Sequence, residues 1–171
     1  VEHYDIEAAV IVMDFMDFGC PVLQARYFEL FMAAVGYYGH GALGSAVGLL
    51  LLAHGYIYDN QRTKRAGGAV LAALMISGIA AELLKHFIRL PIPRLRTSGG
   101  FPSGHASPGF ALSSVLAAAF PAPSSVFYML AVLSAVSRLY FRSQFTWGVA
   151  GGAAIGLLTG VLVARKLIAR S

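Results

Sequence analysis

Five apolar runs follow one another along most of this chain, and each has close to the length that a helix needs to cross a bilayer. Short polar or proline-containing stretches separate the runs. We predict membrane-spanning helices over residues 41–58, 66–84, 106–122, 125–141 and 145–164. Their many Gly, Ala and Ser residues are typical of helices that pack closely in lipid. The predicted fold class is therefore all-α, a polytopic membrane helix bundle.

The N-terminal part of the chain has a different pattern. Residues 4–18 mix apolar positions with acids such as Asp14 and Asp17, which predicts an amphipathic helix lying at the membrane surface. Residues 22–36 form a second mixed segment after the break at Pro21. We therefore expect five to six transmembrane helices and an N-terminal amphipathic region, all in one domain over residues 1–171.

The composition supports a membrane protein and excludes several other classes. Of the residues, 57% are hydrophobic and only 12% are charged, and the mean hydropathy is +0.68. This charge content is far below that of a typical soluble domain. The net charge of +5 comes mostly from Lys and Arg at the ends of the apolar runs, so we expect no nucleic-acid partner. The lone Cys20 excludes an intramolecular disulfide and a cysteine-rich metal site, and no zinc spacing occurs elsewhere.

Three polar clusters occur at the ends of apolar runs. Because successive helices alternate in direction, all three are expected on the same face of the membrane. They are residues 85–94, 102–105 and 137–144. Arg binds phosphate through two parallel hydrogen bonds, Lys adds a point charge, and His exchanges a proton near neutral pH. Any one cluster is explained by cations that extend to the membrane surface. Together they predict a phosphate site.

These clusters resemble the sequence pattern of the type 2 phosphatidic acid phosphatase (PAP2) superfamily of membrane lipid phosphatases. That pattern is Lys, six residues, Arg-Pro; then Pro-Ser-Gly-His; then Ser-Arg, five residues, His, three residues, Asp. Lys85 and Pro93 match its first part. Residues 102–105 match the second part completely, and Ser137-Arg138 begin the third. The order of the parts and the flanking apolar runs also match.

The resemblance implies a single PAP2-like integral membrane domain and a role for each matching residue. It implies metal-independent hydrolysis of a lipid phosphate or diphosphate through a phosphohistidine, with no cofactor. Its partners would be a lipid phosphate and the bilayer. The general acid would be His105. The phosphate would be bound by Lys85, Ser103, Gly104 and Arg138. Either Arg94 or Arg89, in the same connection, would replace the arginine expected where Ile92 stands.

The chain departs from this pattern at the nucleophile. Gln144 stands where the family has its nucleophilic His, and Gly148 stands where the family has the orienting Asp. The lone pair of an amide nitrogen is delocalised, so Gln144 can hydrogen-bond a phosphate but is not expected to attack it. Gln144 is either an engineered or selected replacement that traps substrate, or the mark of a natural pseudoenzyme. In a third explanation another residue, such as His86, serves instead.

The function that the resemblance implies is hydrolysis of an isoprenyl diphosphate or a phospholipid phosphate. The alternative is a non-catalytic lipid-phosphate-binding or accessory subunit on the same fold. Related haloperoxidase chemistry with vanadate ranks below both, because such relatives are mostly soluble and larger. The sequence does not assign the lipid or the oligomeric state.

The orientation in the membrane follows from the distribution of Lys and Arg. Six of them lie on the face of the C-terminal tail and seven on the face of the three clusters, which decides nothing by itself. If cations bound to phosphate are discounted, the tail with Arg165 and Lys166 is cytoplasmic. The phosphate site would then lie on the external face of a bacterial or archaeal cell membrane.

Overall fold

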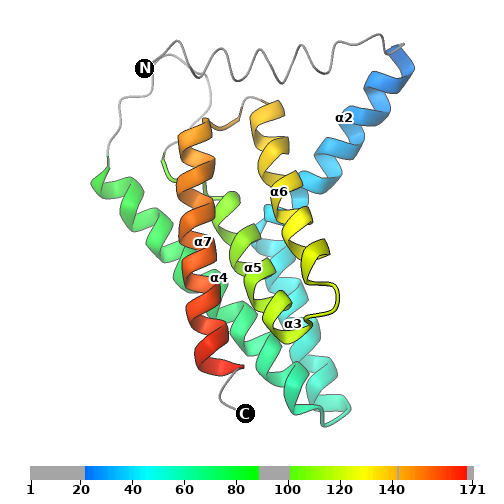
Figure 1. Cartoon of the computed structure of the whole chain (residues 1–171), viewed down its shortest axis with the longest axis vertical. Coiled ribbons are helices and arrows are strands. Elements are labelled where there is room, and N and C mark those ends of the chain that lie inside the picture. Colours follow the sequence, from blue (N-terminus) through cyan, green and yellow to red (C-terminus); the bar gives the residue numbers. More distant parts are fainter. Residues whose placement is uncertain (1–21, 89–100, 142, 169–171) are drawn as a thin grey trace.

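The part of the chain that the structure describes is built from helices. The computed structural model describes residues 22–88, 101–141 and 143–168, and these residues include no strand. The predicted amphipathic segment 4–18 lies outside the described residues. Figure 1 shows the order of the elements. They are α2 (Val22–Gly36), the 3-10 turn η1 (Tyr37–Gly39), α3 (Gly41–Ile57), α4 (Gln61–Phe87), α5 (Ala106–Ala119), α6 (Ser124–Tyr140) and α7 (Thr146–Leu167).

Each of the five predicted apolar runs is a helix, although the ends differ from those predicted. The start of α4 lies at Gln61 and not at residue 66, because the Asn60 side chain accepts hydrogen bonds from the backbone N–H groups of Arg62 and Thr63 at 3.0 and 3.3 Å. Most of the polar stretch between the predicted runs, residues 59–65, therefore belongs to the helix. Residues 120–123 separate α5 from α6.

Helix α5 lies at the centre of the bundle, in contact with α4, α6 and α7 (Figure 1). Most of its residues are buried. Its closest contact is with α7, where three glycines spaced four residues apart face the backbone of α5 and the residues before it. A Cβ at Gly152 would lie 2.6 Å from the carbonyl oxygen of Ser103, and one at Gly160 would lie 2.7 Å from that of Ala111. The absence of these side chains lets the two backbones approach.

The apolar content of the helices indicates an integral membrane protein. Helices α4 and α7 are long and apolar enough to cross a membrane, and a bent pair joining Arg26–Gly39 to Gly41–Ile57 at 60° would raise the number to three. Helices α5 and α6 are apolar but shorter. Many large apolar side chains of the outer helices are exposed, among them Leu50, Met75 and Leu158. Such a surface is suited to lipid and not to water.

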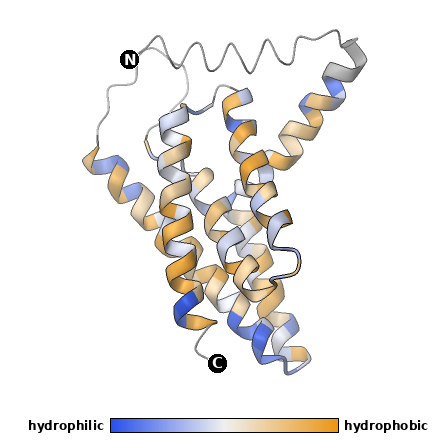
Figure 2. Ribbon diagram, viewed as in Figure 1, coloured by the Kyte–Doolittle hydropathy of each residue, from blue (hydrophilic) through white to orange (hydrophobic). Residues whose placement is uncertain are grey.

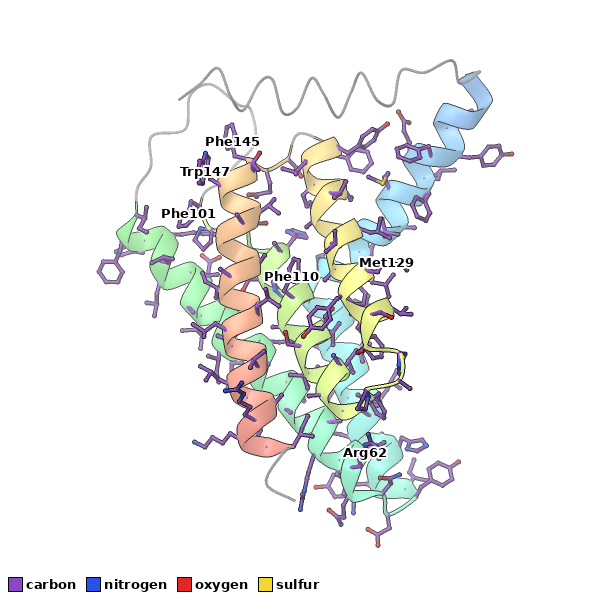
Figure 3. All side chains as sticks on the ribbon, viewed as in Figure 1. Arg62, Phe101, Phe110, Met129, Phe145 and Trp147 are labelled. Carbon is purple, nitrogen blue, oxygen red and sulfur yellow. The ribbon has the colours of Figure 1, made fainter. Side chains whose placement is uncertain are left out.

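Polar residues gather at the two ends of the bundle, with apolar ribbon between them (Figure 2). One end, the site end, holds the last turns of α4 and α6 and the first turns of α5 and α7 (Figure 1). The other, the tail end, holds the α3–α4 connection, the α5–α6 turn and the last turn of α7. This arrangement confirms that the described parts of the three polar clusters lie at one end of the bundle. Figure 3 shows Phe145 and Trp147 at the site end and Arg62 at the tail end.

A pair of glycine substitutions tests the α5–α7 contact. A Cβ at Gly156 would overlap the Ser107 carbonyl oxygen and lie 2.9 Å from the Phe110 Cβ, so Gly156→Ala should cost about 1–3 kcal/mol of stability. The matched control is Gly78→Ala in α4, where a Cβ meets nothing within 4 Å. That change should be neutral or stabilising by up to about 1 kcal/mol. Thermal unfolding in detergent, followed by circular dichroism, measures both. Equal effects would contradict the close contact.

Candidate functional site

The three motif segments converge at the site end. Lys85 lies in the last turn of α4, His105 is the residue before α5, and Arg138 lies in the last turn of α6. A Cβ on Gly104 would lie 3.3 Å from the Lys85 Nζ atom, so the ammonium group sits beside the Pro-Ser-Gly-His turn. The charges of Arg138 and Lys85 both act on the His105 imidazole. The structure therefore brings Lys85, Gly104, His105 and Arg138 together from three separate helices.

Ser103 anchors this turn from the inside. Its backbone N–H donates to the Gly148 carbonyl oxygen at 2.7 Å, and its Oγ accepts from the Ala106 N–H at 3.3 Å. The Ser103 side chain is fully buried. Its hydroxyl thus caps the start of α5, whereas the sequence pattern assigned it to phosphate binding. The bond to Gly148 joins the second motif segment to the first turn of α7.

His40 is a site residue that the sequence did not identify. Its ring packs edge-on against the His105 ring, with 5.6 Å between the ring centroids. The approach depends on Gly39, whose N–H donates to Ser134 Oγ at 3.0 Å and where a Cβ would lie only 2.6 Å from the His105 carbonyl oxygen. His40 Nδ1 accepts from the Ala42 N–H at 3.3 Å as the N-cap of α3.

A cavity of about 310 Å³ opens beside these residues, between η1 and the end of α6. Its polar lining includes His40 and Arg138, and Tyr37 and Phe141 supply aromatic walls. The volume is at the lower end of the range for small-molecule sites. No carboxylate lines the cavity among the described residues. This composition is suited to an anion of about the size of a phosphate or diphosphate group.

Two buried polar atoms near this end have no hydrogen-bond partner in the part of the chain that the structure describes. They are Arg138 Nε and Gln144 Oε1. Buried polar groups in proteins nearly always have a partner, so an unpaired guanidinium nitrogen marks a place where a ligand acceptor fits. A half-turn of the Gln144 carboxamide would put its NH₂ group in the place of Oε1, and both side chains would then donate to an anion.

The remaining predicted site residues have different surroundings. Lys85 Nζ donates to Glu82 Oε1 at 2.5 Å, so a carboxylate partly neutralises this cation before any ligand binds. His86 is exposed and its ring contacts Phe87, at 5.9 Å between centroids. Arg94 lies outside the described residues. Over residues 22–88, 101–141 and 143–168, no group of His, Cys, Asp and Glu is arranged to hold a metal ion.

Burial and neighbouring cations make His105 a weak base when the site is empty. Burial is the largest cause and the positive charges of three neighbours add to it, so that the pKa of His105 falls from 6.5 to about 4. Those neighbours are Arg138, His40 and Lys85, in decreasing order of effect. At neutral pH the imidazole is therefore uncharged. A bound anion would stabilise the protonated form and raise the pKa again.

No protein-family model matches this sequence, and no curated protein sequence matches it. Two solved structures are similar. One is LpxE from Aquifex aeolicus, with a TM-score of 0.67 and 21% identity over 95% of each chain. The other is a transmembrane PAP2 type phosphatidylglycerolphosphate phosphatase from Bacillus subtilis, with a TM-score of 0.62 and 19% identity over 94% of each chain. The chain has a PAP2-type fold.

The fold that the sequence pattern implied is thus confirmed over nearly the whole chain. At these identities the likeness establishes the PAP2 fold and leaves the chemistry to the residues themselves. Within this fold, Lys85, Gly104, His105 and Arg138 form a cationic cluster that includes one imidazole able to carry a proton. Next to that cluster, His40 adds a second imidazole.

The titration of His105 tests whether these groups act on one another. Replacing His40 by Asn removes one of the positive charges that lower the pKa of His105, so that pKa should move from about 4 toward 6.5. The matched control is His54→Asn, since His54 lies near the tail end of α3 and stacks on Tyr58. NMR titration of the imidazole signals measures the change. An unchanged His105 pKa in His40→Asn would contradict the contact between the two rings.

Proposed function

We propose that this protein binds the phosphate or diphosphate head group of a membrane lipid at its site end and hydrolyses it without a metal ion. The observation that carries the proposal is the unpartnered, buried Arg138 Nε in a cationic cavity beside His40, close to His105 and Lys85. Isoprenyl diphosphates and phospholipid phosphates are the candidate substrates. The similar Bacillus subtilis structure is that of a phosphatidylglycerolphosphate phosphatase, which supports a lipid phosphate as the ligand.

Binding would rest on charge and on backbone donors. Arg138 would donate to two phosphate oxygens and Lys85 would exchange its Glu82 partner for the ligand. The N–H groups of Gly104 and His105 donate to no acceptor in the described chain, and they lie at the N-terminus of α5, where anions are stabilised. The lipid tail would remain among the exposed apolar side chains of the outer helices.

Hydrolysis would need an acid and a nucleophile on opposite sides of the phosphorus atom. The charge of the bound phosphate would raise the pKa of His105, which would then protonate the leaving lipid oxygen as the P–O bond breaks. Water, deprotonated by the same imidazole, would later cleave the phosphoenzyme bond and release phosphate. Gln144 cannot supply the attacking atom.

We propose His40 as the nucleophile in place of Gln144. His40 lines the same cavity as Arg138 and lies beside His105, from which its ring would have to separate to admit the phosphorus atom. His86, by contrast, is exposed and contacts Phe87. The Ala42 N–H occupies Nδ1 and so favours the proton on Nε2. For Nε2 to attack, the imidazole proton must lie on Nδ1, so the hydrogen bond from the Ala42 N–H to Nδ1 must break. The bond is exposed and 3.3 Å long, so its loss costs only about 1 kcal/mol.

A second candidate function is lipid-phosphate binding without turnover. Gln144 at the nucleophile position favours it, because a carboxamide there binds an anion and performs no chemistry. Both functions use the same cationic cluster and differ only in whether an imidazole attacks.

We further propose five to six membrane crossings in a single domain, with the site end on the external face of a bacterial or archaeal membrane. The short α5 and α6 would cross within the bundle, with α5 shielded from lipid by its neighbours. A cysteine placed at residue 171 by Ser171→Cys, in a Cys20→Ser background, should resist membrane-impermeant thiol reagents on intact cells. Its labelling from outside would reverse this orientation.

Phosphate release distinguishes the two functions. The substrates are an isoprenyl diphosphate and phosphatidate in detergent with a metal chelator present. If His40 and His105 act as proposed, the unaltered chain releases phosphate, and His40→Gln or His105→Gln lowers the rate at least about 100-fold. His54→Gln and His86→Gln are the matched controls and should change it little.

The Gln144→His variant completes the experiment. Release by this variant alone, with none from the unaltered chain, would establish binding without turnover and would sink the proposed role of His40. Release by the unaltered chain that persists in His40→Gln would place the nucleophile elsewhere. If no variant releases phosphate and none binds either lipid, the site is not a lipid-phosphate site.

A further inference from the structure

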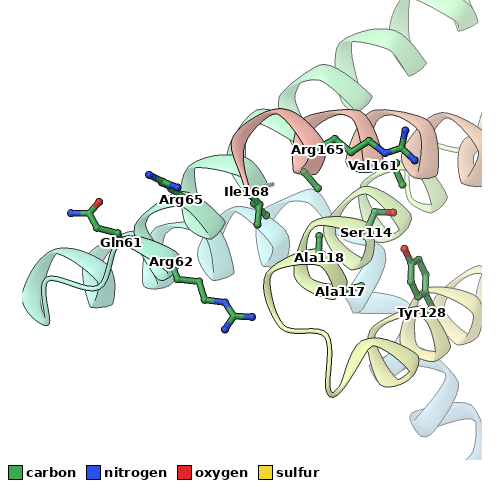
Figure 4. Close-up of a pocket in the computed structure, with 11 residues that line it drawn as sticks. Gln61, Arg62, Arg65, Ser114, Ala117, Ala118, Tyr128, Val161, Arg165 and Ile168 are labelled. Atoms are coloured by element: carbon green, nitrogen blue, oxygen red, sulfur yellow. The ribbon is translucent and has the colours of Figure 1, made fainter. Parts of the chain in front are cut away.

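A second cationic cavity lies at the tail end, remote from the candidate site. It has a volume of about 830 Å³ and lies between the first turns of α4, the last turn of α7 and the α5–α6 region. Figure 4 shows Arg62 extending from α4 toward the α5–α6 turn and Arg165 lying along α7. Arg65, Ser114 and Tyr128 also line it. We name this cavity the basic groove.

The arginines of the basic groove have no carboxylate partner in the described chain. Among the described residues at this end, Lys64 pairs with Asp59 at 2.6 Å, and neither residue lines the groove. Arg62 lies over the Phe120 ring, with 5.7 Å from its Cζ to the ring centroid. That contact holds the guanidinium toward the α5–α6 turn without neutralising it. Three arginines therefore line one cavity that has no carboxylate in its described lining.

The floor of the groove and its exit are apolar. Ala117, Ala118 and Val161 lie beneath the arginines. On α7, Leu158, Leu162 and Arg165 follow one another at helical spacing, so they form one stripe, and both leucines are mostly exposed. A lipid whose head group lies at Arg165 would therefore have its acyl chain along Leu162 and Leu158. This combination of a charged head and an apolar exit fits a phospholipid better than a soluble anion.

The groove is separate from the candidate site. Arg62 and Lys85 lie in the first and last turns of α4, about 35 Å apart at 1.5 Å per residue. One lipid head group cannot reach both. The groove also lies at the opposite face of the bilayer, where its ligand would come from the other leaflet.

We propose that the basic groove is a binding site for an anionic phospholipid of the tail-end leaflet, whose phosphodiester is held by Arg62, Arg65 and Arg165. A phosphodiester with one negative charge accepts bidentate hydrogen bonds from guanidinium groups. The bound lipid would bridge α4 and α7, the two long helices of the bundle. It would be a structural ligand and not a substrate.

Native mass spectrometry of the full chain in detergent tests this proposal, with dioleoyl phosphatidylglycerol as the probe and dioleoyl phosphatidylcholine as the uncharged comparison. The unaltered chain should retain phosphatidylglycerol preferentially. Replacing Arg62 and Arg165 together by Gln should weaken its binding about 20- to 30-fold. Lys166→Gln is the matched control, because Lys166 is an exposed cation on the same turn of α7 and does not line the groove. It should weaken binding less than about threefold.

Two further arms locate the lipid. The double variant Lys85→Gln with Arg138→Gln should leave phosphatidylglycerol binding unchanged. If this variant loses phosphatidylglycerol, the lipid binds at the candidate site and the proposal is overturned. Arg62→Lys with Arg165→Lys keeps the charges and should retain most of the binding, which guards against a folding defect in the Gln variant. Equal retention of both lipids, equal weakening by Lys166→Gln, or displacement by millimolar inorganic phosphate would each overturn it. The outcome does not depend on whether the site end hydrolyses a lipid.

Discussion

Close backbone contact between α5 and α7 is the constraint on which the rest of the structure depends. Gly152 and Gly160 leave no room for a Cβ against the backbone of α5 and the turn before it. The Ser103 N–H bond to the Gly148 carbonyl then fixes the height of α5 relative to the first turn of α7. His105, two residues after Ser103, takes its place from this contact. The small residues of the bundle therefore position chemistry as well as helices.

Charge is distributed in the same way at the two ends of the bundle. Each end has one lysine paired with an exposed carboxylate, Lys85 with Glu82 and Lys64 with Asp59. Each end also leaves arginine beside a cavity with no carboxylate in its described lining. The buried Nε of Arg138 is costly to leave without a partner unless an anion reaches it, whereas the arginines of the basic groove are exposed and attract an anion by their charge. Lipid phosphate is the anion available at both faces.

The sequence predicts the helices well, because apolar runs between polar breaks depend on local composition. It also predicts that Lys85, His105 and Arg138 meet, because alternating helix directions put three motif segments at one end. It could not identify His40. The contact of His40 with His105 depends on the hydrogen bond between Gly39 and Ser134, and these two residues lie far apart in the chain and share no local pattern. The start of α4 was missed since one Asn60 side chain extends the helix into a basic stretch.

The replacement at Gln144 separates two properties that a phosphatase site normally combines. Affinity for phosphate needs cations and donors, and Lys85, Arg138 and the start of α5 provide them. Attack on phosphorus needs an imidazole with a free lone pair, which the third motif segment lacks. His40, the N-cap of α3, can supply this imidazole if its exposed hydrogen bond with the Ala42 N–H breaks, which costs about 1 kcal/mol. That cost is small compared with the roughly 8 kcal/mol or more by which enzymes typically lower the activation free energy. The replacement of the nucleophilic His by Gln144 is therefore compatible with turnover, because breaking one exposed hydrogen bond of His40 uses only a small part of that difference.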